Sequence, residues 1–268
     1  MIDLKNICEA AIPIIKKAGE FIRSQRVSFN NEAVEYKGYN DLVSYVDKNA
    51  ELILVEGLQQ LIPDVGFITE ENTLSIADRD YQWIIDPLDG TTNFVHGIPC
   101  YCVSVGLTFH NKLVMGIVYE INLDECFYAW KGGGAWMNGK SIAVSKIDTV
   151  AKSLLATGFP YTNYDRMIPY MEVFDYCMRN THGIRRLGSA AVDLAYVACG
   201  RFEGFYEYGL NSYDVAAGAF IVMEAGGKVS DFSGNENFLF GREIIACNNG
   251  MFDEFLSVVK MYFEKNNR

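Results

Sequence analysis

The densest group of residues that could do chemistry lies in the segment Trp83 to Phe94, which reads WIIDPLDGTTNF. The apolar run Trp83 to Ile85 predicts a buried strand, and Asp86 and Asp89 follow at its end. Pro87 keeps the backbone between the two aspartates extended rather than helical. The pattern therefore predicts two carboxylates delivered to the end of one strand, where they could bind cations.

The next three residues, Gly90, Thr91 and Thr92, stand where a helix would begin. The free amides of a helix start can hold a phosphate while the neighbouring aspartates hold cations. Asp-Pro and Asp-Gly are also common in ordinary turns, and Thr91 could serve only as a helix cap. This motif alone leaves both interpretations open.

Two further acidic segments favour the metal interpretation. Glu70 and Glu71 directly follow an apolar strand pattern, and bringing such like charges together costs energy unless a cation lies between them. Asp214 precedes the small residues Ala216, Ala217 and Gly218, which would let a helix pack tightly. Asp214 is then either the N-cap of that helix or a metal ligand.

The overall charge narrows the class of partner. The chain has 268 residues, a formal charge of -11 and an isoelectric point near 4.8. Nucleic acid as substrate is disfavoured, because phosphate backbones are held by an excess of Lys and Arg. An acidic protein that handles a phosphate must recruit positive charge, and metal ions are the obvious source.

The cysteine and histidine content argues against a Cys-x-x-Cys site and a zinc site. The seven cysteines contain no Cys-x-x-Cys pair and indicate reduced, mostly buried thiols, while three scattered histidines do not predict a zinc site. The N-terminus lacks the pattern of a signal peptide, and no apolar run is long enough to cross a bilayer. We expect a cytoplasmic protein with no membrane partner.

The hydrophobic periodicity predicts an α/β protein with two packed halves. Residues 1–145 read as an α+β subdomain with mostly antiparallel strands, and residues 146–268 as an α/β subdomain, the two forming one compact unit. The polar segment 30–41 is expected to be a loop. Helices are expected at 4–22, 46–61, 190–199, 215–225 and 252–263, and strands at 66–69, 81–85, 101–109, 113–121 and 125–130.

The acidic segments, in this order, resemble the inositol monophosphatase family. Its signatures are an Asp-Pro-Ile/Leu-Asp-Gly-Thr motif, matched from Asp86 to Thr91, and a later Trp-Asp-x-Ala-Ala-Gly motif, matched from Asp214 to Gly218. Segments 41–47 and 188–195 are also similar to family segments. Tyr213 departs from the pattern, because many members carry Trp there; this puts the packing of the helix start in question, not the carboxylate.

The resemblance implies a fold, a cofactor and a set of ligands. The fold would be a five-layered αβαβα sandwich, usually a homodimer, and the enzyme would be magnesium-dependent and lithium-sensitive with two or three Mg²⁺ ions per subunit. The implied metal ligands are Glu70, Asp86, the backbone carbonyl of Leu88, Asp89 and Asp214. Glu70 and Thr91, itself oriented by Asp47, would activate the attacking water.

The resemblance also implies a reaction and its substrate contacts. The reaction would be hydrolysis of a phosphomonoester, most like that of inositol 1-phosphate, by in-line attack of water, and no Cys-x5-Arg signature suggests a covalent alternative. Family members also act on fructose 1,6-bisphosphate, NADP, 3'-phosphoadenosine 5'-phosphate and histidinol phosphate. The implied substrate-binding residues are Gly90, Thr91, Thr92, Gly188, Ser189, Ala190, Glu207 and Asp214.

Each substrate contact has a plainer interpretation. Gly188 and Ser189 could only start a helix, and Glu207 could be a solvated charge at a strand end. A regulatory protein that binds the transcription machinery is an alternative of another class, with Arg185 and Arg186 on its docking surface. The complete carboxylate set favours the enzyme, because binding a partner would not need so many acidic groups around a metal.

Overall fold

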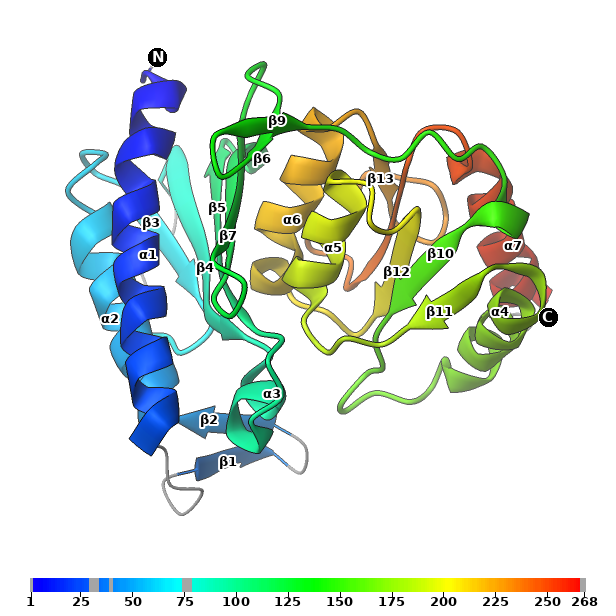
Figure 1. The fold of residues 1–268 in the computed structure, drawn as a ribbon, viewed down its shortest axis with the longest axis horizontal. Coiled ribbons are helices and arrows are strands. Elements are labelled where there is room, and N and C mark those ends of the chain that lie inside the picture. Colours follow the sequence, from blue (N-terminus) through cyan, green and yellow to red (C-terminus); the bar gives the residue numbers. More distant parts are fainter. Residues whose placement is uncertain (1, 29–33, 39–40, 74–78, 266–268) are drawn as a thin grey trace.

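The computed structural model describes residues 2–28, 34–38, 41–73 and 79–265, with side chains for 2–27, 45–73 and 79–265. Its elements form five layers (Figure 1). Helices α1 (Leu4–Ser28) and α2 (Tyr45–Leu58) cover one face of a first sheet, α5 (Ala190–Ala198) and α6 (Ser212–Glu224) lie between the two sheets, and α4 (Met167–Asn180) and α7 (Phe252–Lys265) cover the far face of the second. The expected αβαβα sandwich is confirmed.

The first sheet contains seven strands of the described chain and follows their sequence order. Only β3 and β4 pair in parallel; every later pair is antiparallel, as the hairpin-type turns at His110-Asn111 and Asn138-Gly139 require. Short helix α3 (Thr91–His96) follows β4. The strands are β3 (Gly66–Thr69), β4 (Tyr81–Asp89), β5 (Cys102–Phe109), β6 (Lys112–Glu120), β7 (Glu125–Trp130), β8 (Ala135–Met137) and β9 (Lys140–Ile142).

The second sheet is mixed, with five described strands in the order β11-β10-β12-β14-β13. Strand β10 is parallel to both of its neighbours, whereas β14 is antiparallel to β12 and β13. Helix α4 had no counterpart among the expected helices. The strands are β10 (Leu154–Thr157), β11 (Gly183–Arg185), β12 (Gly204–Tyr208), β13 (Lys228–Ser230) and β14 (Glu243–Cys247), and a 3-10 turn precedes them (Val150–Lys152).

The expectation of a loop at 30–41 is wrong in part. Strand β1 (Val34–Gly38) pairs with β2 (Asp41–Ser44) in an antiparallel hairpin, while residues 30–33, 39 and 40 lie outside the described residues. The polar composition of the segment hid the alternation of Val34 and Tyr36, which is strand spacing.

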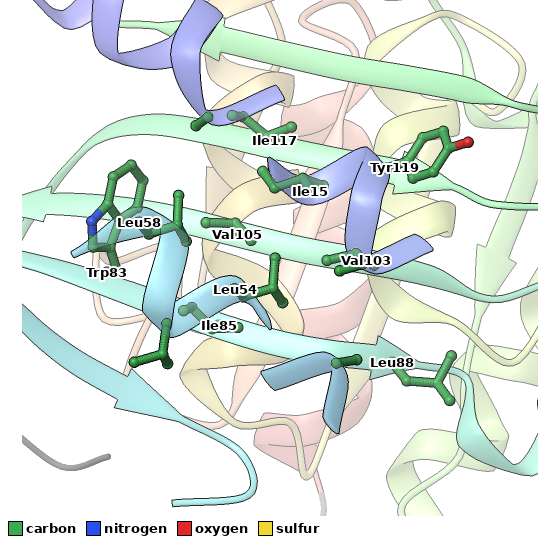
Figure 2. Packing of buried hydrophobic residues seen from close by; sticks show 14 of the residues in the cluster. Ile15, Leu54, Leu58, Trp83, Ile85, Leu88, Val103, Val105, Ile117 and Tyr119 are labelled. Atoms are coloured by element: carbon green, nitrogen blue, oxygen red, sulfur yellow. The ribbon is translucent and has the colours of Figure 1, made fainter. Parts of the chain in front are cut away.

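Side chains of the first sheet alternate between two cores. Trp83 and Ile85 point toward α1 and α2, where Figure 2 shows them beside Leu54 and Leu58. Ile84, between them, packs in the core around α5 and α6. Because of this period of two, β4 is buried on both of its faces.

Helix α6 lies unusually close to the first sheet because the facing residues are small. A Cβ added to Gly116 would lie 2.4 Å from the Ala217 carbonyl oxygen, and one added to Gly106 would lie 2.8 Å from the Ala216 Cβ. A Cβ on Gly218 would lie 2.5 Å from the Cβ of Leu194 in α5. The tight packing expected from the Ala-Ala-Gly run is confirmed, and it fixes where α6 begins.

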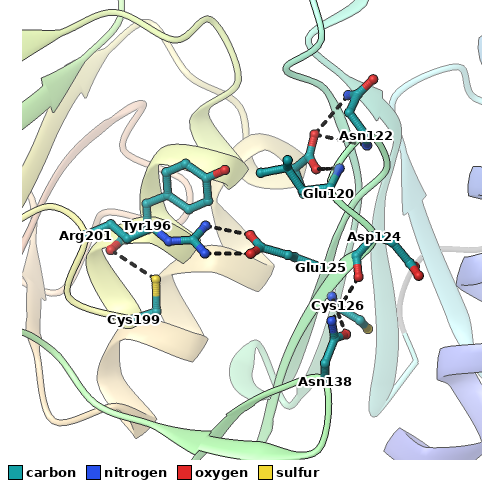
Figure 3. A network of polar contacts seen from close by, with 10 residues as sticks. Glu120, Asn122, Asp124, Glu125, Cys126, Asn138, Tyr196, Cys199 and Arg201 are labelled. Atoms are coloured by element: carbon teal, nitrogen blue, oxygen red, sulfur yellow. Dashed lines mark hydrogen bonds and ion pairs between the residues drawn. The ribbon is translucent and has the colours of Figure 1, made fainter.

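Polar contacts around β7 join the two halves (Figure 3). Glu125 at the start of β7 accepts two hydrogen bonds from the Arg201 guanidinium, at 2.5 and 2.6 Å, and that guanidinium lies 4.5 Å from the Tyr196 ring centroid. Buried Glu120 accepts hydrogen bonds from Asn122 and from the Leu123 amide in the turn between β6 and β7. The helix layer is thus held to the sheet by charge as well as by apolar packing.

No helix among the described residues combines the length and the apolar character that crossing a bilayer requires.

We predict that Gly116→Ala lowers the free energy of unfolding by about 1 to 3 kcal/mol, because the new methyl group must push the α6 backbone away from the sheet. Gly132→Asn is the matched control. A Cβ added to Gly132 would meet no atom within 4 Å, and Asn tolerates its φ of 75°. Urea unfolding of the three proteins measures the effect. Equal stability of Gly116→Ala and wild type would contradict the close packing of α6.

Candidate functional site

A β-bulge in β4 brings Asp86 and Asp89 to the same side of the sheet. Residues three apart on a regular strand point to opposite faces. Here Asp86 lies opposite Ser104 and Asp89 opposite Cys102, so three residues of β4 span two residues of β5. The extra residue reverses the alternation, and both carboxylates can face the helix layer.

Each aspartate has one oxygen held by neighbouring donors. The Leu88 amide donates to Asp86 Oδ1 at 3.0 Å. Asp89 Oδ2 accepts from the Ser189 hydroxyl and from the Ala191 amide, both at 2.7 Å. Those donors belong to the start of α5, so Ser189 both caps this helix and orients Asp89.

Asp214 enters the same site from α6. The structure corrects one alternative, because Asn211 is the N-cap of α6 and Asp214 stands three residues further on. Its Oδ2 accepts a hydrogen bond from the backbone amide of Asn211 at 2.6 Å. Asp86, Asp89 and Asp214 each offer an oxygen within 4.8 Å of the others.

The electrostatics of this triad favour a bound cation. Burial, and then repulsion by Glu70, Asp89 and Asp214, raises the pKa of Asp86 well above its usual value, and a hydrogen bond with Glu70 adds to the effect. Burial also raises the pKa of Asp89, against the opposing effect of its donors. An all-oxygen, negatively charged set at this spacing fits a hard divalent ion such as Mg²⁺, which would remove the repulsion.

Glu70 reaches the triad from the neighbouring strand. It directly follows β3, which is parallel to β4, so both strands end at the same edge of the sheet. Buried Glu51 of α2 holds the segment after Glu70, accepting from the Glu71 amide at 2.8 Å and from the Thr73 amide and hydroxyl at 2.8 and 2.6 Å. Of the expected glutamate pair, Glu70 lines the cleft described below and Glu71 does not.

Thr91 and Asp47 are in contact, as the sequence suggested. The Thr91 hydroxyl oxygen lies 3.0 Å from Asp47 Oδ1 and 2.9 Å from the Leu88 carbonyl oxygen. One hydroxyl proton cannot serve both, and the carboxylate of Asp47 is the stronger acceptor. The Leu88 carbonyl therefore keeps a lone pair for another partner.

Two glycines with positive φ join the halves of the site. Gly90 has a φ of 96°, and a Cβ there would lie 3.3 Å from the Gly188 carbonyl oxygen. Asn93 fixes this contact, because its amide donates to the carbonyls of Cys100 and Leu187, both at 2.8 Å. The helix start at Thr91 is thereby held against the loop before α5.

These groups surround a cleft of about 270 Å³. Every site residue expected from the sequence lines it except Asp47, which lies behind Thr91. The lining includes Glu70, Asp86, Leu88, Asp89, Gly90, Thr91, Thr92, Gly188, Ser189, Ala190, Glu207 and Asp214. A cleft of this size fits a small molecule rather than a macromolecule.

Glu207 forms the wall of the cleft and is buried, so the interpretation as a solvated charge is wrong. A Cβ on Gly158 would lie 2.1 Å from its carboxyl oxygen, so a larger residue there would displace the Glu207 carboxyl group. Burial and the neighbouring Asp214 raise the pKa of Glu207 to about 8, against the attraction of Arg186. Glu207 can thus exchange a proton near neutral pH.

Sequence reasoning missed three charged residues around the site. Asp193 is buried in α5, lines the cleft and has no hydrogen-bond partner at Oδ1; its one signal was a carboxylate in an otherwise apolar helix. Glu51 looked like an ordinary helix residue. Arg242 lines the cleft from the segment before β14, and nothing in its sequence neighbourhood marks it.

Comparisons with known proteins agree with this geometry. The model of the inositol monophosphatase family matches residues 3–260. The chain is 42% identical to inositol monophosphatase 2 of Solanum lycopersicum (96% of this chain, 98% of the relative), and 38% identical to the putative Nus factor SuhB of Neisseria meningitidis (94% and 97%). A crystal structure of the extragenic suppressor protein suhB from Bartonella henselae superposes with a TM-score of 0.88 at 37% identity, covering 94% of this chain and 97% of that one.

We predict that Mg²⁺ raises the melting temperature of the metal-free protein by roughly 5 to 10 °C at a concentration a hundred times its Kd. A pKa raised in the folded state contributes stability below the unfolded value and loses it as pH rises through the folded value. The metal-free protein should therefore melt at a lower temperature as the pH rises above the usual range of a carboxyl pKa.

Asp86→Asn should reduce this pH dependence and abolish the response to Mg²⁺, whereas the exposed Asp253→Asn should keep both. Thermal scans with EDTA or Mg²⁺ at several pH values supply the measurement. Equal melting temperatures with EDTA and with Mg²⁺ would be evidence against the cation site.

Proposed function

The chain belongs to the inositol monophosphatase family, and we propose that it is a magnesium-dependent phosphomonoesterase that hydrolyses a small phosphate ester, inositol 1-phosphate being the favoured substrate. The observation that carries the proposal is the triad Asp86, Asp89 and Asp214, whose oxygens lie within 4.8 Å of one another on the wall of a small cleft. A protein that only binds partners has no use for such a repulsive group.

The proposed ligands are those that the acidic cluster offers. Glu70, Asp86 and the Leu88 carbonyl would hold one ion, and Asp86, Asp89 and Asp214 another, with Asp86 shared. When bound, magnesium supplies the positive charge that lowers the barrier to attack on a phosphate dianion. The first-turn amides from Gly90 to Thr92 would bind the phosphate oxygens.

The attacking water would be oriented by protein groups. The Thr91 hydroxyl donates to Asp47, so its oxygen is left to accept a hydrogen bond from water. Glu70 would take the proton that the water loses as its oxygen attacks phosphorus in line with the departing alcohol oxygen. The bond from phosphorus to the alcohol oxygen breaks, and that oxygen takes up a proton from solvent water as Glu70 returns its own to solvent. Inorganic phosphate and the free alcohol are then released.

The alcohol would be recognised on the opposite wall. Gly188, Ser189 and Ala190 border the cleft at the start of α5, and Glu207 faces them from β12. A further carboxylate beside the phosphate would repel it, because the phosphate is negatively charged. The partner expected for Glu207 is therefore a hydroxyl group of the substrate. Burial, and then repulsion by Asp214, raises the pKa of Glu207. Cations beside Asp214 would oppose the second effect and so favour the ionised form of Glu207 as an acceptor.

Other substrates of the same class stay open to assay. Fructose 1,6-bisphosphate, NADP, 3'-phosphoadenosine 5'-phosphate and histidinol phosphate are the alternatives.

We also propose two or three Mg²⁺ ions per subunit, inhibition by lithium, a homodimer, a cytoplasmic location, and subdomains that meet near residues 145 and 146. Sequence resemblance supports these proposals, and each has a direct measurement.

A regulatory role is the second candidate, favoured by one observation: a relative at 38% identity is named a putative Nus factor. In this chain Arg186 is exposed at the mouth of the cleft, beside Arg185. Binding to transcription proteins that survives loss of the acidic triad would support that role. It would not exclude phosphatase activity.

We predict that Asp89→Asn abolishes magnesium-dependent phosphate release while the fold survives, because an amide cannot supply the charge that holds the second ion. The measurement is phosphate release from the five candidate substrates, with circular dichroism to verify folding. Asp253→Asn, exposed and distant in the sequence, is the control. Turnover by metal-free enzyme or by folded Asp89→Asn protein would exclude the metal assignment.

We predict that Glu207→Gln lowers kcat/KM on inositol 1-phosphate by roughly tenfold, since a charge-assisted hydrogen bond exceeds a neutral one by about 1 kcal/mol or more. A phosphate ester whose alcohol has no other hydroxyl should lose little. The ratio of the two efficiencies in wild type and variant isolates the effect. An equal fall on both substrates would mean that Glu207 does not read the alcohol.

A further inference from the structure

Arg242 adopts a backbone conformation that its side chain does not favour. Among the non-glycine residues with positive φ in the described chain, Arg242, at 63°, is the one that is not Asn, Asp or His. Those three types tolerate the left-handed region, whereas a long side chain is strained there. Such a conformation persists only where the surrounding contacts hold it.

Contacts with the connection between β12 and α6 hold Arg242 in this conformation. Arg242 Nη1 donates to Asn211 Oδ1 and Nη2 donates to the Gly209 carbonyl, both at 2.9 Å. The Gly209 amide donates to the Arg242 carbonyl at 2.7 Å. Because Tyr208 lies opposite Glu243 in the antiparallel pair of β12 and β14, the residue before β14 necessarily meets the segment after β12.

Asn211 links this contact to the acidic triad. It is the N-cap of α6, and its amide donates to Asp214 Oδ2 at 2.6 Å. The carboxylate of Asp214 has an oxygen within 4.8 Å of those of Asp86 and Asp89. The guanidinium therefore holds the side chain of the residue whose backbone holds Asp214.

We propose that Arg242 is a positioning residue for the metal site: its planar fork fixes Asn211 and thereby aims the Asp214 carboxylate at the shared cation position. The proposal rests on the proposed metal-dependent function. Two donors in fixed geometry define the direction of Asn211, which a flexible ammonium cannot do. The strained φ of Arg242 is the cost of bringing the guanidinium over this connection.

The test measures Mg²⁺ and Mn²⁺ binding by calorimetry on Arg242→Asn, Arg242→Gly and Arg242→Lys. Affinity should fall about tenfold in each, as expected when a group that orients a ligand is lost. Arg242→Asn and Arg242→Gly relieve the backbone strain, so the melting temperature without metal should not fall. In phosphate-release assays the Mg²⁺ half-saturation should rise, while KM for substrate at saturating Mg²⁺ stays within twofold of wild type.

Three outcomes would overturn the inference. Affinity for both ions within twofold of wild type in all variants would show that Arg242 does not position Asp214. A rise in substrate KM at saturating Mg²⁺ with unchanged ion affinity would make Arg242 a substrate contact instead. A wild-type protein that binds neither ion would remove the metal site itself, which separates failure of the proposed function from failure of this inference. If Arg242→Asn and Arg242→Gly do not fold, Arg242→Lys carries the same comparison.

Discussion

The mutual repulsion of three aspartates is the interaction on which the rest of the structure depends. Asp86 and Asp89 come from one strand, and Asp214 comes from a helix of the other half of the chain, yet all three are held within 4.8 Å. Burial makes the repulsion stronger, since little water screens the charges. The protein therefore stores an unfavourable charge arrangement that a divalent cation would relieve, and each surrounding contact prevents the carboxylates from moving apart.

The means of holding them are mechanical as well as polar. The bulge in β4 turns Asp86 and Asp89 to one face, and the Ser189 hydroxyl fixes the second of them. Gly116 lets α6 approach the sheet closely, which brings Asp214 at the start of that helix near β4. Apolar cores pack against both faces of the first sheet and support this scaffold, and Figure 2 shows the one beneath α1 and α2. Packing energy thus supports an electrostatically costly site, as pre-organised metal centres require.

The sequence could reveal many of the helices and strands and the carboxylates, because strand and helix periods and the type of a ligand are local properties. It did not reveal α4 or the hairpin of β1 and β2. It could not reveal the bulge between Asp86 and Asp89, since that feature appears only in the pairing with β5. For the same reason Asp214 looked like a helix cap, although the chain enters the helix three residues earlier at Asn211. Glu51 stabilises the turn after Glu70 through contacts between residues 20 and 22 positions apart, which no short motif records.

The central claim is that the acidic triad is a divalent cation site, and anomalous diffraction from crystals grown with Mn²⁺ tests it most directly. The account predicts an anomalous peak between Asp86, Asp89 and Asp214, with a second peak beside Glu70 and the Leu88 carbonyl, both lost when excess Mg²⁺ competes. Crystals that bind Mn²⁺ only at other surfaces, with the three carboxylates protonated and bonded to one another, would contradict it.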